Sequence, residues 1–73
     1  MTLRELPIGK DAKVIAVHGN SVVSRRLMEM GVVPGVSIKM IKAAPFGDPV
    51  EIRLLGYSLA IRNREADAVE VEV

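Results

Sequence analysis

The fold of this chain is decided by the stretch Arg26-Leu27-Met28-Glu29-Met30-Gly31-Val32-Val33-Pro34-Gly35, which predicts the end of a helix, a tight turn and the start of a strand. Gly31 stands where a helix would finish in the left-handed conformation, which only a residue without Cβ adopts at low cost. Val32 is placed to fold back onto Leu27 as the apolar contact of a Schellman cap. The proline and glycine that close the stretch suit the two central positions of a type II turn. These residues therefore predict a helix that packs against a sheet.

The residues before and within this stretch have helical periodicity. Val23, Leu27 and Met30 share one face at about 100° per residue, while polar side chains occupy the other faces. Asn20 or Ser21 provides the N-cap. No other part of the chain has a clear helical period, so we expect one short α-helix.

Alternating apolar and polar residues predict about five short strands. They fall at residues 13–17, 36–40, 50–54, 59–61 and 69–73, and each strand has one apolar face. Residues 55–58 predict a tight reversal, and residues 63–67 predict a helical or 3₁₀ connection. Near the N-terminus, a turn or single helical turn is expected to place Leu3 and Leu6 against one end of the core. Strands of this number and length close most economically into a small barrel, with the helix over one opening.

Size and composition disfavour several classes of protein. A chain of 73 residues forms one domain, residues 1–73, with a single small core and no deep cleft, which disfavours an enzyme. Ten Lys and Arg stand against nine Asp and Glu, so the formal charge of +1 does not favour nucleic acid or an anionic membrane as a partner. The absence of cysteine removes disulfides, thiolate nucleophiles and cysteine-based zinc sites. The charged N-terminus and the lack of a long apolar run predict a cytoplasmic protein that does not insert into a membrane.

Side chains suited to catalysis or metal binding are sparse. His18 is the sole histidine, and no nucleophile or carboxylate lies at a recognisable spacing from it, so a turn histidine is the favoured interpretation. One histidine with dispersed acids is also a poor ligand set for iron(II) or zinc. No glycine-rich loop followed by Lys and Ser or Thr is present to hold nucleotide phosphates. We therefore expect no catalytic, cofactor or tight metal site, and at most weak or transient binding of a transition metal.

Four large apolar residues do not fit the predicted core. Ile41 and Leu55 fall on strand faces whose neighbours are charged. Met28 lies about 100° from the buried stripe of the helix, and Phe46 stands at the tip of a proline-bounded loop. Binding energy at interfaces is concentrated in a few large side chains, so these four are the candidate partner-binding residues. The alternative is that the helix hides Ile41 or Leu55 and that Phe46 folds back as a loop anchor.

Four arginines form a second candidate surface. Arg25, Arg26, Arg62 and Arg64 fall in or beside the two predicted helical segments, where they would suit an acidic partner. A solvated or ion-paired surface is the favoured interpretation, because most exposed charges contribute little.

Two motifs carry a family resemblance. The stretch 26–35 and the loop Ala44-Pro45-Phe46-Gly47-Asp48-Pro49-Val50 resemble the ferrous iron transport protein A family, whose members typically read R-L-x-x-M/L-G-[hydrophobic]-x-P-G and then A-P-[F/L]-G-D-P. The match extends from residues 3–9 to residues 59–66 and a final valine-rich strand, so it covers nearly the whole chain. The turn residues of the two motifs are expected to be structural: Gly31, Pro34, Gly35, Pro45, Gly47 and Pro49.

The resemblance implies a fold, a function and a partner. The family has an SH3-like barrel, and its members are small cytoplasmic accessory proteins of bacterial-type ferrous iron uptake. The implied partner is the membrane permease ferrous iron transport protein B, whose cytoplasmic part is a GTP-binding domain. We therefore expect a protein that acts by protein-protein contact rather than as an enzyme. It would be a monomer or weak homo-oligomer, associated with the membrane through that partner.

Two other functions remain open on the sequence. A similar barrel forms the C-terminal part of metal-dependent repressors, where it acts in metal sensing, but this chain carries no DNA-binding domain. Other small barrels bind RNA, which predicts a dense face of Lys and Arg with aromatic platforms. Here Phe46 and Tyr57 are the only aromatic residues, so iron uptake is the favoured interpretation.

Overall fold

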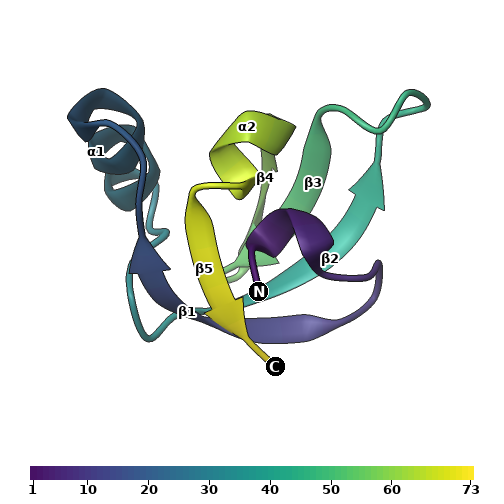
Figure 1. Cartoon of the computed structure of the whole chain (residues 1–73). Helices are drawn as coiled ribbons and strands as arrows, with labels where there is room; N and C mark the ends of the chain where they lie inside the picture. The colour runs from purple at the N-terminus through teal and green to yellow at the C-terminus, as the bar shows by residue number, and fades with distance from the viewer.

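The computed structural model describes all 73 residues (Figure 1). In chain order the elements are the 3₁₀ helix η1 (Leu3–Glu5), β1 (Asp11–Val17), α1 (Ser21–Glu29), β2 (Ser37–Ala43), β3 (Val50–Leu54), β4 (Tyr57–Ile61), α2 (Asn63–Ala66) and β5 (Val69–Glu72). A membrane-crossing helix must be long and apolar, and none of these helices meets that requirement. The mainly β class with one short α-helix of clear period is confirmed, and the connection at residues 63–67 contains the single turn α2.

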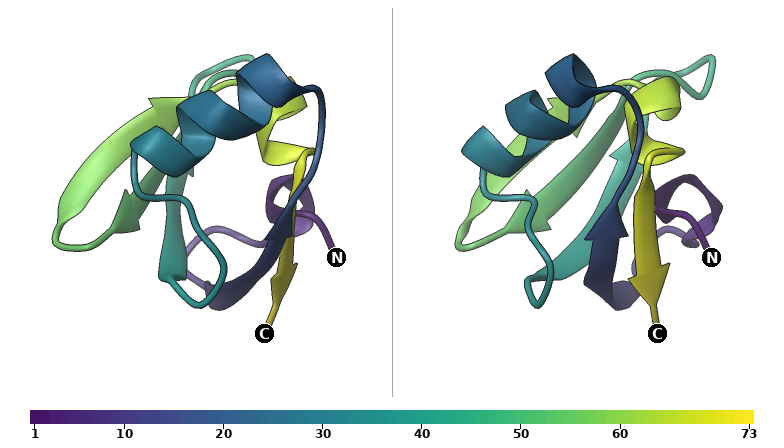
Figure 2. Two further views of the ribbon diagram at one scale, coloured as in Figure 1. Left: turned by 90° about the vertical axis from the view of Figure 1, so that its left-hand side faces the viewer. Right: turned by 60° about the vertical axis from the view of Figure 1, so that its left-hand side comes forward.

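The five strands form one antiparallel sheet in the order β4-β3-β2-β1-β5. The sheet curves strongly, and α1 lies across its open side at one end (Figure 2). The outer strands β4 and β5 do not pair with each other, so the barrel has an open seam. α2 connects these two strands at the end of the barrel that α1 also covers. The fold is therefore an incompletely closed barrel whose two outer strands are β4 and β5.

The core lies inside the curved sheet and follows the predicted alternation. Its buried side chains are Leu3, Leu6, Ala12, Val14, Leu27, Val32, Ile38, Met40, Val50, Ile52, Leu54, Ile61, Ala66, Val69 and Val71. Leu3 and Leu6 are 0% and 3% exposed, so η1 closes one end of the core as expected. Arg4 of η1 also pairs with Asp67 just after α2 at 2.9 Å, which ties η1 to α2. Each fully buried Leu or Ile contributes roughly 1.5–3 kcal/mol to stability, so packing is the main source of stability.

α1 is capped at both ends. Asn20 is the N-cap, and its Oδ1 accepts a hydrogen bond from the Val23 N–H at 2.9 Å. At the other end the Val32 N–H bonds the Leu27 carbonyl at 3.0 Å, and the Gly31 N–H bonds the Met28 carbonyl at 3.0 Å. Gly31 has φ +98°, so this pair of bonds has the pattern of a Schellman cap.

The turn after α1 joins the helix to the sheet. The Val36 N–H bonds the Val33 carbonyl at 3.2 Å, and Gly35 has φ +96°, as a type II turn with Pro34 in its second position requires. The Gly35 N–H donates to the Val14 carbonyl at 2.8 Å, and the Val14 N–H donates to the Val36 carbonyl at 2.8 Å. The turn is therefore hydrogen-bonded to β1, which fixes where α1 ends relative to the sheet.

The structure corrects the expected strands in several places. β1 begins at Asp11 rather than at residue 13, and β2 spans Ser37–Ala43 rather than residues 36–40. The reversal is confined to Leu55 and Gly56, so β4 begins at Tyr57 rather than at residue 59. The pairing of β2 with β3 shifts register between Met40 and Lys42, which leaves Ile41 as the extra residue of a β-bulge. Val73 was expected on the buried face of the last strand, but it lies beyond β5 and is 80% exposed.

Candidate partner-docking surface

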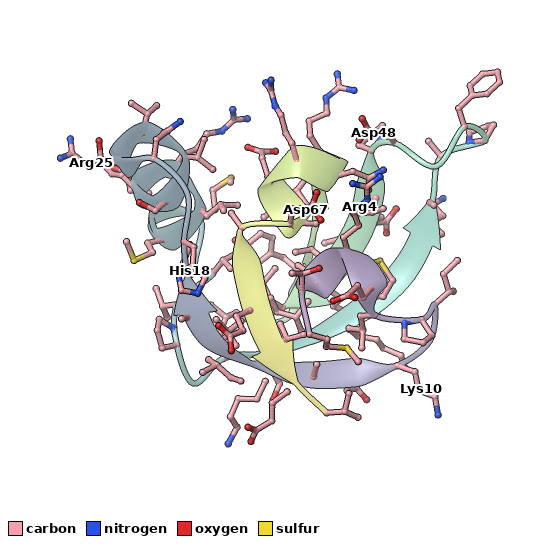
Figure 3. All side chains as sticks on the ribbon, viewed as in Figure 1. Arg4, Lys10, His18, Arg25, Asp48 and Asp67 are labelled. Atoms are coloured by element: carbon pink, nitrogen blue, oxygen red, sulfur yellow. The ribbon has the colours of Figure 1, made fainter.

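The polar side chains make pairs, and no three of the His, Asp and Glu side chains gather in a geometry that holds a metal ion. His18, just after β1, has its Nε2 atom 3.1 Å from Glu70 Oε1 on β5. The two side chains are 62% and 46% exposed, and Figure 3 shows His18 on the outside of the barrel. This arrangement agrees with the interpretation of His18 as a histidine at a strand end, in an exposed hydrogen-bonded pair with Glu70.

Glu65 is the one buried charged residue, at 6% exposure. Its Oε1 atom accepts a hydrogen bond from the Arg62 N–H at 2.9 Å, as in a capping box at the start of α2. Its Oε2 atom lies 3.7 Å from Arg26 Nη1 on α1. Both oxygens are therefore used to cap one helix and to tie it to the other, which is a structural role.

Leu55 is a large apolar residue exposed at the β3–β4 turn. Its side chain is 68% exposed, yet its Cδ1 atom packs on Gly31 so closely that a Cβ added to that glycine would lie 2.9 Å away. Tyr57, on the other side of the turn, donates a hydrogen bond from its hydroxyl to the Met30 carbonyl at the end of α1. The turn and the C-terminal end of α1 therefore form one surface.

We name this surface, formed by Met28, Leu55 and Tyr57, the hairpin surface. All three side chains are partly exposed, at 43%, 68% and 42%. Met28 lies on the last turn of α1, two residues before Met30, whose carbonyl accepts the Tyr57 hydroxyl. Sequence reasoning missed Tyr57, which it assigned to a reversal. The available signal was that Tyr57 is the sole tyrosine, a residue type typical of strands, although it lay within the predicted turn.

The backbone of Leu55 is strained. It has φ +51°, and it is the only residue other than glycine with a positive φ. With Gly56 at φ +83°, it forms a two-residue turn of the type in which Asn-Gly is the preferred pair. A leucine in the left-handed conformation costs about 1–2 kcal/mol relative to its relaxed state. An exposed apolar residue held at this cost is an indication of function.

Phe46 lies on a second, separate surface. It is 99% exposed in the β2–β3 loop, where the Gly47 N–H bonds the Ala44 carbonyl at 2.7 Å across Pro45 and Phe46. Asn63 of α2 holds the loop by donating from Nδ2 to the Gly47 carbonyl at 2.7 Å. The loop is therefore an ordered support that presents a phenyl ring to solvent.

Two further hydrogen bonds hold this loop, one to α2 and one between its own two ends. Asp48 Oδ1 accepts the Asn63 N–H at 2.9 Å, which is a second bond between this loop and α2. Pro49 follows a cis peptide bond, and its carbonyl accepts the Ala44 N–H at 2.9 Å. Figure 3 shows Asp48 and Arg25 on opposite sides of α2, so this loop and α1 are well separated.

The four sequence-predicted apolar residues thus fall into three places. Met28 is on the last turn of α1, Leu55 packs on Gly31 just beyond that turn, and Phe46 is on the β2–β3 loop. Ile41 is half-buried at the bulge of β2. The four residues do not form one continuous patch.

Comparison with known proteins identifies the family. The FeoA domain model matches residues 1–73, which is the whole chain. A curated relative, the Fe(2+) transport protein A/Fe(2+) transporter FeoB fusion protein of Porphyromonas gingivalis, is 38% identical over 73 residues, which are 100% of this chain. This chain spans only 9% of the length of that fusion protein.

Two solved structures place the fold in the same family. A FeoA-like protein from Clostridium acetobutylicum matches with a TM-score of 0.93 and 44% identity, over 100% of this chain and 85% of that chain. FeoA from Stenotrophomonas maltophilia, solved in complex with zinc and described as an SH3 domain protein, matches with a TM-score of 0.86 and 37% identity, over 99% of this chain and 89% of that chain. The expected SH3-like fold is confirmed. The chain belongs to the FeoA domain family, which is associated with ferrous iron transport.

Proposed function

We propose that this chain is an accessory protein of ferrous iron uptake that acts by contact with the membrane permease ferrous iron transport protein B. The observation that carries the proposal is the Porphyromonas gingivalis relative, in which an A-type domain and the FeoB transporter are one polypeptide. Covalent fusion holds two domains at a high effective concentration, which is useful when they act together. The fusion therefore supports contact between a domain of this family and the permease.

The absence of a deep pocket favours contact as the mode of action. The hollows in the surface are shallow and open, and the one with only polar lining is bounded by three side chains, Asp48, Arg62 and Arg64. Ligand sites for small molecules are usually concave and largely apolar, with a few converging polar groups. The chain is therefore proposed to bind a protein rather than to transform a substrate, and to do so in the cytoplasm beside the permease's GTP-binding domain.

Met28, Leu55, Phe46 and Ile41 remain the proposed contact residues, with Leu55 and Phe46 as the main anchors. Leu55 combines 68% exposure with a strained backbone, and Phe46 combines 99% exposure with an ordered loop. Apolar side chains on an ordered backbone lose less entropy on binding than those on a backbone that must first be ordered. Ile41 is half-buried and contributes less contact area. As a free protein the chain is proposed to be a monomer or weak homo-oligomer that binds transition metals weakly.

The test separates a binding role for Leu55 from a structural one. Leu55→Asn creates the preferred Asn-Gly turn and should raise the free energy of unfolding by up to about 1 kcal/mol, because asparagine tolerates a positive φ. The same change removes the apolar anchor and should weaken copurification with the full-length permease of the same organism. A variant that is less stable than the wild type would show that Leu55 serves folding.

Ile8→Asn is the matched control. Ile8 is an aliphatic residue of similar exposure, 63%, and lies in the segment between η1 and β1, away from the hairpin surface. It should leave copurification unchanged. If Leu55→Asn is folded and binds the permease as well as Ile8→Asn does, the hairpin surface is not the contact. If the wild-type chain does not bind the permease at all, the proposed function is wrong.

A further inference from the structure

The outer edge of β4 has backbone groups without partners. Leu54 and Tyr57 close the two-residue turn, and in such hairpins the closing pair exchanges both hydrogen bonds. Hydrogen-bonded pairs alternate along an antiparallel ladder, so Tyr57, Leu59 and Ile61 face β3. Ser58 and Ala60 therefore direct their N–H and C=O groups away from the sheet. Figure 2 shows β4 as the outermost strand beside α1.

This edge lacks the usual protection against pairing. Residues 57–61 read Tyr-Ser-Leu-Ala-Ile, with no charge and no proline, and their pairing with β3 has no bulge. Exposed edge strands usually carry a charged residue, a proline or a bulge, because an edge without any of these pairs readily with other chains. The residues that bear the outward groups, Ser58 and Ala60, also have small side chains that let another backbone approach.

The other free edge of the sheet is covered. The β5 edge forms a bridge between Thr2 and Glu70, and the Val71 N–H donates to the Met1 carbonyl at 2.8 Å. β5 also carries Glu70 and Glu72, whose charges discourage pairing. The two edges of this sheet therefore differ: the β5 edge is covered by other residues of the chain, and the β4 edge is not.

The surroundings of the open edge are positive. Arg53 lies opposite Ser58 on β3, and Arg62 follows directly after β4. These two arginines and Arg64 are exposed and make no ion pair, whereas the carboxylate of Glu51, opposite Ala60, is 3.8 Å from Lys42 Nζ. A strand added to β4 would be separated from Arg53 by β4 itself, and it would pass the end of β4 that Arg62 follows. Acidic side chains on that strand would gain favourable charge contacts, and a second copy of this edge would bring more arginines together.

We propose that the β4 edge binds an extended acidic segment of the permease as a sixth strand of the sheet. This inference rests on the proposed function, because it names the partner's segment that the chain would hold. Ser58 and Ala60 together offer two N–H and two C=O groups for such a strand, which is the mode known as β-strand addition. The added strand would pass Leu55, the residue before the turn glycine, so backbone pairing and the apolar anchor would act on the same partner.

The test removes one outward hydrogen-bond donor and keeps the sheet. Ala60→Pro deletes an N–H that points to solvent, a position where edge strands tolerate proline. Ala60→Val keeps the donor and is the matched control. We expect Ala60→Pro to weaken binding of the full-length permease in lipid nanodiscs by about tenfold or more, because it removes one bond and obstructs strand pairing. Ala60→Val should bind within about threefold of the wild type.

A second measurement does not depend on the variants. Hydrogen exchange of the Ser58 and Ala60 amides should slow when the wild-type chain binds the permease, because both N–H groups enter a ladder. Unchanged exchange at both residues during saturated binding would overturn the inference even if Ala60→Pro proved too unstable to use. Binding should also weaken as salt is raised, because the segment is acidic.

The outcomes distinguish this inference from the proposed function. If wild-type chain and permease do not bind, both are wrong. If they bind and Ala60→Pro binds equally well, the function stands and the strand addition is wrong. Salt-independent binding would refute the acidic segment. Self-association of the wild-type chain that Ala60→Pro abolishes, measured by sedimentation, would show that a second copy occupies the edge instead.

Discussion

Substituting Gly31 by valine tests whether the helix end is set by the backbone conformation of one residue. Gly31 has φ +98°, and its N–H bonds the Met28 carbonyl in the cap of α1. A Cβ at this position would lie 2.9 Å from Leu55 Cδ1 and 3.7 Å from Leu54 Cδ1. The first distance requires a shift, and the second is an ordinary contact. Valine therefore meets both backbone strain and a side chain that must move.

The expected loss can be assembled from these two terms. A residue with Cβ in the left-handed conformation costs about 1–2 kcal/mol, and a β-branched residue such as valine costs more than an unbranched one. Moving the end of the Leu55 side chain costs less, because it is flexible and 68% exposed. We expect Gly31→Val to lower the free energy of unfolding by about 2–3 kcal/mol, which for a domain of this size lowers Tm by roughly 10–20 °C.

Urea denaturation followed by circular dichroism measures the loss, and Gly35 supplies a control. Gly35 has nearly the same φ, +96°, but nothing lies within 4 Å of an added Cβ. Gly35→Ala therefore measures the backbone term alone, and Gly31→Ala measures the same term plus the contact with Leu55. Gly31→Ala should be the more destabilising of the two alanine variants. An unchanged denaturation midpoint for Gly31→Val would refute the reasoning, since the helix would then end elsewhere.

Four further outcomes are expected. Asn20→Ala removes the acceptor for the Val23 N–H and should lower the free energy of unfolding by about 1 kcal/mol in urea denaturation. The purified chain should release no phosphate from GTP above the buffer rate, because it lacks a glycine-rich phosphate loop; a protein-dependent, stoichiometric rate would contradict this. Calorimetric titration with zinc or iron(II) should give a Kd weaker than about 1 µM, because the His18 and Glu70 pair supplies too few ligands; a saturable nanomolar site would overturn this. Phe46→Asp should leave Tm unchanged, because the side chain is 99% exposed, and should weaken permease binding in the same copurification assay.

The sequence predicted correctly those features that depend on residues close together in the chain, namely the helix caps and the turn after α1. The cap at Gly31, the turn at Pro34 and Gly35, and the N-cap at Asn20 each involve residues within a few positions of one another. The core alternation was also readable, because a half-buried strand requires a period of two. These features determine the sheet and the placement of α1, so the fold class followed from the sequence.

The predictions from the sequence were wrong where contacts between segments far apart in the chain determine the structure. The start of β4 depends on Leu55 taking a positive φ, which its residue type disfavours and which packing against Gly31 stabilises. The bulge at Ile41 depends on how β2 pairs with β3, and the bond that Asp48 accepts from the Asn63 N–H joins a loop to a helix 15 residues later. Such contacts have no signature within either segment. These long-range contacts also determine why the four apolar candidates lie on separate surfaces rather than in one patch.

The separation of Phe46 from the hairpin surface limits how a partner binds. The β2–β3 loop and the C-terminal end of α1 lie on different sides of the molecule, so one compact contact region on the partner does not reach both (Figure 1). An extended segment along β4 starts beside Leu55 and ends beside α2, and Asn63 of α2 holds the loop that carries Phe46. A strand on this edge therefore connects the two apolar anchors, and loss of the edge should weaken the contribution of both.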